Sequence, residues 1–209
     1  MKTDPTENLY HLQQKDVWRA SATLADAFRD DPVWKTVFAG ARLDQMESMF
    51  AVPLQYCVRY GQVYATSEKL EGIITWVPGD LANMTSWRVF RSGAIWSALK
   101  GNFLLAAKMQ PIFWPVEVDR KANMQDTPYL YLPVLGIASQ FQGQGLGRKL
   151  LQALIAESER IHRPIYLETE TESNVRWYNK FGFETLKQII LPRIELPMWE
   201  MIRKPTQEL

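Results

Sequence analysis

The chain has 209 residues, of which 46% are hydrophobic and 22% are charged, and its 24 basic residues nearly balance 23 acidic ones. This length and composition predict one domain over residues 1–209 and exclude a collagen, a coiled coil or a mostly disordered chain. Because there is no basic excess, we expect no nucleic-acid partner. The single cysteine, Cys57, rules out an internal disulfide framework and favours a reducing compartment.

Neither targeting nor membrane insertion is indicated. The first eight residues are polar and lack the apolar stretch of a secretory signal. The most hydrophobic window, residues 93–107, contains Lys100 and Asn102 and is shorter than the roughly 20 apolar residues that a spanning helix needs. We therefore expect a cytoplasmic protein with no membrane partner.

Hydrophobic periodicity and turn residues give the predicted elements in chain order. They are helices over 16–28 and 43–60, strands over 62–66 and 72–77, a helical stretch over 81–109, a strand over 129–136, a helix over 146–161, a strand over 165–169, a short helix over 174–181, and strands over 183–191 and 196–203. The segment from Pro111 to Pro115 and a charged stretch to Asp126 are expected to lead out of the middle helix, so that 81–127 form a helical insertion. This order predicts an α/β fold with a mixed sheet and helices on both faces.

The most informative stretch runs from Leu135 to Arg148, where a buried strand leads through a short loop into a helix that starts with three alternating glycines. The first amides of a helix have no partner within it, and the helix dipole favours negative charge there. Glycine lets an anion approach those amides without a Cβ in the way, so a phosphate or pyrophosphate is the expected ligand. Each glycine lowers the stability of the helix by up to about 1 kcal/mol, which favours a binding role for the three over a glycine cluster that is merely tolerated.

Two common phosphate motifs do not fit this loop. The P-loop pattern is absent, and the dinucleotide fingerprint Gly-x-Gly-x-x-Gly fails because its third glycine would fall on Arg148. The spacing Gln142-x-x-Gly145-x-Gly147 instead resembles the coenzyme A loop of the GNAT-superfamily N-acyltransferases, whose pattern is Gln/Arg-x-x-Gly-x-Gly/Ala.

The resemblance continues on both sides of the loop. Residues 164–169 look like the fifth strand of that family, and residues 174–183 are similar to its Asn-x-x-x-Tyr-x-x-x-Gly-Phe segment. Residues 27–32 resemble its first helix and turn. The resemblance implies a GNAT-like fold, in which a central, mostly antiparallel sheet is splayed at a coenzyme A cleft, with acetyl-CoA as co-substrate and no metal.

The resemblance also implies which residues bind acetyl-CoA. Main-chain groups after the buried strand would pair with the pantetheine arm like an added strand, and the glycine loop would hold the pyrophosphate. Asn174 would bond the pantetheine, although capping of the short helix that it begins is a strong competing role. The residues implied for acetyl-CoA binding are Leu135, Gly136, Ile137, Gln142, Gly143, Gln144, Gly145, Leu146, Gly147, Arg148, Asn174 and Tyr178.

The same resemblance makes Tyr178 the candidate general acid, which would protonate the departing coenzyme A thiolate. For the general base, the sequence offers Glu168 and Glu170, which share one face of a strand, and a solvated strand end is the competing interpretation. Asp31 and Trp34 occupy the turn that often borders the acceptor in this family. A metal site is not indicated, because His11 and His162 lie far apart with no suitable ligand spacing.

We therefore expect an enzyme that transfers an acetyl group from acetyl-CoA to a primary amine of a small molecule, by direct attack in a ternary complex. Alternative functions are a non-catalytic acyl-CoA-binding sensor or interaction module, a protein-lysine or N-terminal acetyltransferase, and an oxidoreductase that holds a nucleotide cofactor on the same loop. The two C-terminal strands can pair within one chain or across a homodimer.

Overall fold

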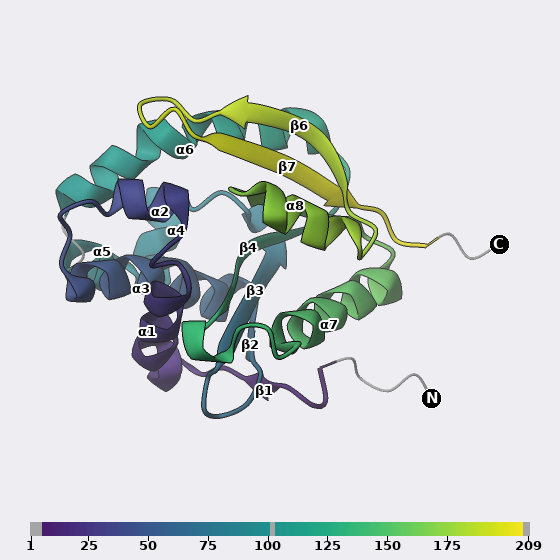
Figure 1. The fold of residues 1–209 in the computed structure, drawn as a ribbon, viewed down its shortest axis with the longest axis horizontal. Helices are drawn as coiled ribbons and strands as arrows, with labels where there is room; N and C mark the ends of the chain where they lie inside the picture. The colour runs from purple at the N-terminus through teal and green to yellow at the C-terminus, as the bar shows by residue number, and fades with distance from the viewer. Residues whose placement is uncertain (1–5, 101–102, 207–209) are drawn as a thin grey trace.

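In the computed structural model, which describes residues 6–100 and 103–206, seven strands form one sheet in the order β1-β2-β3-β4-β5-β7-β6 (Figure 1). All neighbouring strands are antiparallel except β4 and β5, which run parallel. This is the mixed, mostly antiparallel sheet that we expected, and β6 pairs with β7 within the chain. The strands are β1 (Tyr10–His11), β2 (Gln62–Ala65), β3 (Gly72–Pro78), β4 (Leu130–Ile137), β5 (Ile165–Thr169), β6 (Glu184–Ile190) and β7 (Pro197–Arg203).

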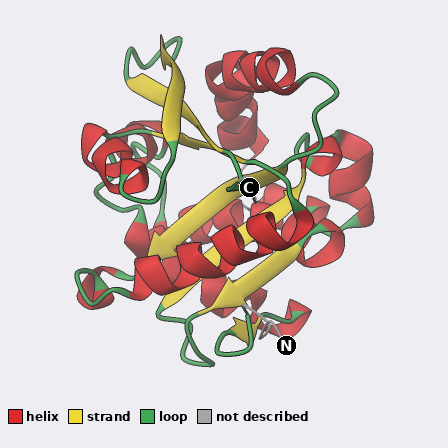
Figure 2. Ribbon diagram, turned by 90° about the vertical axis from the view of Figure 1, so that its right-hand side faces the viewer, coloured by secondary structure: helices red, strands yellow, loops and turns green. Residues whose placement is uncertain are grey.

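Helices cover both faces of the sheet, as Figure 2 shows. They are α1 (Val17–Ala27), α2 (Pro32–Val37), α3 (Leu43–Tyr60), α4 (Ser86–Arg91), α5 (Ile95–Lys100), α6 (Phe103–Met124), α7 (Leu146–Ile161) and α8 (Glu172–Asn179). None of the described helices is long and apolar enough to cross a membrane.

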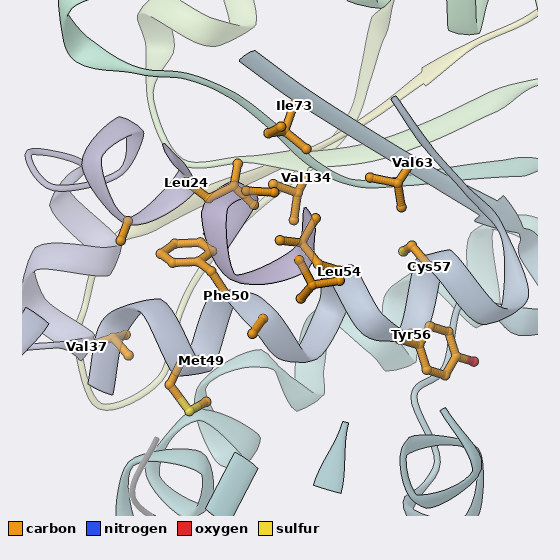
Figure 3. Close-up of a cluster of buried hydrophobic side chains, with 14 of the residues drawn as sticks. Leu24, Val37, Met49, Phe50, Leu54, Tyr56, Cys57, Val63, Ile73 and Val134 are labelled. Atoms are coloured by element: carbon orange, nitrogen blue, oxygen red, sulfur yellow. The ribbon is translucent and has the colours of Figure 1, made fainter. Parts of the chain in front are cut away.

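The sheet separates two hydrophobic cores, because successive residues of a strand point to opposite faces. Ile73 of β3 packs with Leu24 of α1 and Leu54 of α3 in the first core, which Figure 3 shows in close-up. The next residue, Ile74, packs with Leu150 of α7 in the second core. Cys57 lies in the first core, where burial raises the pKa of its thiol to about 12, so the thiol packs as a small apolar group.

The parallel strands β4 and β5 are joined over only part of their length. Their pairing runs from Leu130 with Ile165 to Leu132 with Leu167, after which β4 pairs only with β3 and β5 only with β7 among the described strands. The two strands diverge from this point, and the edge of β4 that faces β5 has no strand partner over residues 133–137. The splayed sheet that the sequence predicted is thus present.

The helical insertion differs from the prediction. The stretch 81–109 is not one helix, because Gly93, with φ +79°, interrupts it after α4, and α5 and the first turns of α6 follow. Residues 101 and 102 lie outside the described part of the chain.

The expected exit from the insertion, Pro111 to Pro115, was also wrong, since both prolines lie inside α6. A proline in a helix costs about 3 kcal/mol. Burial of Ile112, Val116 and Arg120 on one face of α6 offsets that cost and carries the helix on to Met124.

The short helix α2 and the two-residue strand β1 were missed by the sequence prediction. Helix α1 ends at Ala27, and the segment Asp30-Asp31-Pro32 that follows it starts α2. The Asp31 carboxylate accepts hydrogen bonds from the amides of Val33 and Trp34 at 3.0 and 3.1 Å, and Pro32 occupies the first turn, where proline is tolerated.

Candidate active site

A cleft of about 680 Å³ opens where β4 and β5 diverge. Its walls come from the end of α1, the turn into α2, the unpaired edge of β4, the glycine loop, the start of α7, and α8. Of the predicted acetyl-CoA residues, those that line the cleft are Leu135, Gly136, Ile137, Gln142, Gly143, Gly145, Leu146, Gly147, Arg148, Asn174 and Tyr178. Gln144 is not among them, because its side-chain amide turns back to donate to the carbonyl of Gln140 at 3.3 Å.

The glycine loop is shaped by its backbone conformation. Gly143 and Gly145 have φ values of +77° and +81°, and a Cβ built on either would meet nothing within 4 Å. The Gln142 side chain donates to the carbonyl of Ile137 at 3.1 Å and so ties the loop to the end of β4. The first amides of α7, which have no partner within the helix, therefore border an open space that suits an anion.

Gly136 lacks a side chain for a different reason. A Cβ at this position would lie 2.8 Å from Cδ2 of Leu24 and 3.0 Å from Cε2 of Phe28, because α1 packs closely against β4. The sequence indicated only a main-chain role for Gly136 at the cleft. The structure adds that this glycine permits the helix to pack on the strand.

Helix α8 begins two residues earlier than predicted. Its N-cap is Thr171, whose Oγ1 accepts a hydrogen bond from the amide of Asn174 at 3.2 Å. Asn174 is therefore not the capping residue, and the competing structural role considered for it was wrong. Asn174 instead lines the cleft.

Tyr178 is buried in the second core, where its ring lies 4.9 Å from that of Trp177 and 5.3 Å from that of Phe183. Burial, helped by the negative charge of Glu170, raises the pKa of the phenol above its usual value. The hydroxyl makes no hydrogen bond to any residue of the described ranges. Tyr178 therefore keeps its proton at neutral pH.

A second cavity, of about 400 Å³, lies between α2, α3, α6 and the sheet. Its apolar wall is a cluster of aromatic rings around Trp34, whose ring centroid lies 5.2 Å from that of Phe50, 5.4 Å from that of Phe38 and 5.7 Å from that of Phe113. Trp34 was predicted to border the acceptor, and it lines this cavity. Phe113 comes from α6, so the insertion supplies another wall.

Both candidate carboxylates, Glu168 and Glu170, line this second cavity, but their surroundings differ. Glu168 accepts hydrogen bonds from Nη1 of Arg120 and from the hydroxyl of Tyr131, both at 2.8 Å. Arg120 also donates to Oδ1 of Asn83 at 3.1 Å and lies over the Tyr131 ring. Glu168 is thus held in a buried ion pair. Sequence reasoning missed its partners because nothing in the pattern of α6 marks Arg120 as facing a strand.

Glu170 has no ion-pair partner within residues 6–100 and 103–206. Burial, together with the negative charge of Asp31, raises its pKa to about 8. Burial also raises the pKa of Asp31. Two short segments border both the cleft and the cavity. In the first, Asp31 lines the cleft and Trp34 lines the cavity. In the second, Thr171 lines the cleft and Glu170 lines the cavity. The cleft and the cavity therefore adjoin at these two segments.

Neither the cleft nor the cavity is lined by a group of described side chains that could bind a metal ion. In the part of the chain that the structure describes, no group of three or more His, Cys, Asp or Glu side chains is arranged to hold a metal ion.

Three solved structures have the same fold as this chain. A Corynebacterium glutamicum protein described as histone acetyltransferase HPA2 and related acetyltransferase aligns with a TM-score of 0.64 at 19% identity, over 96% of this chain and 97% of its own. A mosquito protein, arylalkylamine N-acetyltransferase like 5b, aligns with a TM-score of 0.57 at 13% identity, over 94% and 98%. The NatC complex bound to Gag peptide and CoA gives a TM-score of 0.51 at 16% identity, over 95% and 98%.

Sequence comparison goes further than the fold. Residues 116–185 match the family model of the acetyltransferase (GNAT) domain. An uncharacterised N-acetyltransferase of Schizosaccharomyces pombe is 31% identical over 208 residues, which cover 94% of this chain and 83% of that protein. A relative this similar over nearly the whole chain establishes the family, and the protein is a member of the GNAT superfamily of N-acetyltransferases.

Proposed function

We propose that this N-acetyltransferase moves the acetyl group of acetyl-CoA to the primary amine of a small molecule, by direct attack in a ternary complex. The observation that carries the proposal is the meeting of two unlike hollows at Glu170 and Asp31. One is an amide-lined cleft at the splayed edge of β4, and the other is a cavity with an aromatic wall.

The cleft fits acetyl-CoA at both ends. The unpaired edge of β4 over residues 135–137 offers main-chain groups to the amides of the pantetheine arm. The start of α7 offers amides and a positive helix dipole to the pyrophosphate, with open space at Gly143 and Gly145. Arg148, exposed at the same helix start, adds a positive charge. Acetyl-CoA supplies an activated thioester, and these residues would hold and orient it.

Glu170 is the proposed general base. At neutral pH an alkyl amine carries an extra proton and cannot attack until it loses it. A carboxylate with a pKa of about 8 is a stronger base than an ordinary one, and Glu170 lines the cavity that would hold the amine. Glu168 was the other candidate. It is already committed to Arg120 and Tyr131, so we assign it to positioning the cavity floor.

Tyr178 is the proposed general acid. When the amine nitrogen bonds to the acetyl carbon and the carbon–sulfur bond breaks, coenzyme A leaves as a thiolate. Tyr178 lines the cleft with a protonated and otherwise unengaged hydroxyl, and it donates that proton to the sulfur. The nitrogen then releases its second proton to solvent, from which Tyr178 is reprotonated, and Glu170 returns its proton to solvent, so that the net products are the acetylated amine, coenzyme A and one proton.

The acceptor is proposed to be a small amine with an apolar body. The volume of about 400 Å³ is in the range of small-molecule sites, and its wall of Trp34, Phe38, Phe50 and Phe113 suits an aromatic or aliphatic group. A peptide acceptor is the second candidate, because structures of similar fold include protein acetyltransferases.

A thiol-release assay with acetyl-CoA and a panel of acceptors tests the proposal. The panel contains an arylalkylamine, an aliphatic polyamine, a peptide with a free N-terminus and an N-blocked lysine peptide. Turnover with the arylalkylamine at a higher kcat/KM than with either peptide is expected. Turnover with peptides alone would move the function to protein acetylation. If acetyl-CoA bound but every acceptor failed, the non-catalytic sensor would be favoured instead.

A further inference from the structure

Large apolar side chains that remain exposed are concentrated on the helical insertion. Six of the ten that the described residues include come from α4, α5 and α6. They are Trp87 (64% exposed), Phe90 (58%), Trp96 (71%), Leu99 (55%), Trp114 (56%) and Val118 (41%). Aromatic side chains gain more from burial than almost any other, so rings this exposed indicate a surface that meets a partner.

The exposed side chains of α4 and α5 point away from the core, because both helices are fixed to the same stretch of α3. The hydroxyl of Tyr56 donates to the carbonyl of Leu81, five residues before the start of α4, at 2.7 Å. The next residue back, Gln55, accepts a hydrogen bond from Ser97 of α5 at 2.9 Å. Both short helices therefore lie against α3, and the exposed side chains of each are directed to solvent.

Cations accompany the exposed rings. The Arg91 guanidinium carbon lies 5.9 Å from the centre of the Trp87 ring, and Trp87 stacks on Phe90. On α5, exposed Lys100 ends the helix that presents Trp96 and Leu99, and its Nζ lies 5.0 Å from the centre of the ring of Trp18 in α1, which is also exposed. We call the residues that these two helices expose, namely Trp87, Phe90, Arg91, Trp96, Leu99 and Lys100, the α4–α5 surface.

The local charge of this segment differs from that of the whole chain. Residues 81–116 contain four cations, Arg88, Arg91, Lys100 and Lys108, and no Asp or Glu, whereas the full chain is nearly neutral. Such a run attracts a surface of negative charge. We expected no membrane partner because the most hydrophobic window is too short to span a bilayer, and that criterion does not test for a surface that lies on one.

Exposed tryptophans interleaved with arginine and lysine match the chemistry of a bilayer surface with anionic lipids. Trp and Phe rings settle at the level of the headgroups, while the cations pair with lipid phosphates and carboxylates. Helices of six residues are too short to insert across a bilayer but can lie on it. We propose that the α4–α5 surface docks the protein on anionic lipid bilayers. This proposal is independent of the acceptor that the active site takes.

Vesicle co-sedimentation of the full chain tests the proposal. At about 0.1 M salt, the protein is expected to pellet with vesicles of phosphatidylcholine and phosphatidylserine in a 7:3 ratio, and at least tenfold less with phosphatidylcholine alone. Raising the salt should release part of the bound protein. The double variants W87S/W96S and R91E/K100E should each lower the bound fraction at least tenfold.

Matched controls separate this surface from general stickiness. The variant L186S/I190S removes two apolar side chains of β6 that are 45% and 60% exposed, and K69E/R163E reverses two exposed cations elsewhere. Both should pellet like the unmodified protein. Thermal unfolding of every variant checks the fold, and quenching of the unmodified protein's tryptophan fluorescence by brominated lipid gives a readout that needs no variant.

Three outcomes would overturn the proposal. The first is no pelleting and no quenching with anionic vesicles. The second is pelleting that folded W87S/W96S and R91E/K100E retain. The third is a dimer in analytical ultracentrifugation that W87S/W96S dissociates, with no lipid binding, which would assign the surface to a second copy of the chain.

Discussion

Arg120 of α6 and Glu168 of β5 form an ion pair across the floor of the aromatic cavity, with Nη1 of Arg120 2.8 Å from Oε1 of Glu168. Their side chains are only 6% and 8% exposed. The pair joins the helical insertion to the strand that leads to Glu170. The wall that α6 provides and the carboxylate proposed to accept a proton therefore share one buried anchor.

Breaking this ion pair from one side should be costly. Arg120→Met leaves the Glu168 carboxylate buried without a cation, which typically lowers the free energy of unfolding by about 3–5 kcal/mol. Urea denaturation measures the loss, and adding Glu168→Gln to the same chain should recover much of it. The control is Lys121→Met, which removes an exposed pair with Glu117 and should cost less than about 1 kcal/mol. Equal effects of the two single variants would refute a special role for Arg120.

Removing the Tyr178 hydroxyl should slow the chemical step and leave the fold intact. Tyr178→Phe keeps the ring packing against Trp177 and Phe183, and the hydroxyl has no hydrogen-bond partner in the described ranges. General acid catalysis contributes about 10²–10⁴-fold, so kcat should fall by that order while the acetyl-CoA affinity and the thermal midpoint stay unchanged. Full activity in Tyr178→Phe would rule out the assignment and leave Tyr178 as a packing residue.

Glu170→Gln should lose activity and gain stability. The folded-state pKa of about 8 lies above the ordinary glutamate value of about 4.3, so over this pH window the folded protein holds a proton that the unfolded chain releases. Stability of the unmodified protein is therefore lost as pH rises through the window. The variant has no ionisable group at this position and so lacks this loss. Its thermal midpoint should therefore exceed that of the unmodified protein, and the difference between the two midpoints should grow from pH 5 to 8 and stay constant above about pH 9. A constant margin would contradict the raised pKa.

Asp31→Asn tests the electrostatic link between the two segments. Asparagine still caps α2 but removes the negative charge that helps to raise the pKa of Glu170. The acidic limb of kcat/KM, which reports deprotonation of the base, should then move to lower pH with the same amine. An unmoved pH profile in a variant that binds acetyl-CoA normally would show that Asp31 does not act on the base.

Alanine substitutions at two glycines with nearly the same backbone conformation distinguish an effect of backbone strain from an effect on acetyl-CoA binding. Gly145, with φ +81°, starts α7 at the cleft, and Gly40, with φ +78°, lies in an exposed turn, and neither would place a Cβ within 4 Å of another atom. An alanine at either site should cost about 1–2 kcal/mol in unfolding. Only Gly145→Ala should also weaken the binding of acetyl-CoA, which would be seen as a smaller rise in the thermal midpoint when acetyl-CoA is added. Equal rises in both variants would remove the loop from the proposed binding site.

The parts of the site that the sequence could predict are those in which nearby residues act together. The loop from Gln142 to Gly147 and the helix after it follow from glycine spacing and apolar periodicity, and α7 begins and ends where they indicated. Splaying of the sheet followed from the resemblance that the same spacing carries. Helix α8 was placed two residues late because Thr171 and Asn174 are both good capping residues, and only the backbone geometry selects Thr171.

What the sequence by itself determined, then, was the position of most strands along the chain and the loop that borders the cleft, because these depend on contacts between residues close in the chain. The tertiary structure decided what depends on distant segments. Packing of α1 explains the glycine at 136, burial of one face carries α6 through two prolines, and Arg120 reaches Glu168 over 48 positions. The same packing leaves Glu170 without a cation, and so distinguishes two carboxylates that look equivalent along the chain.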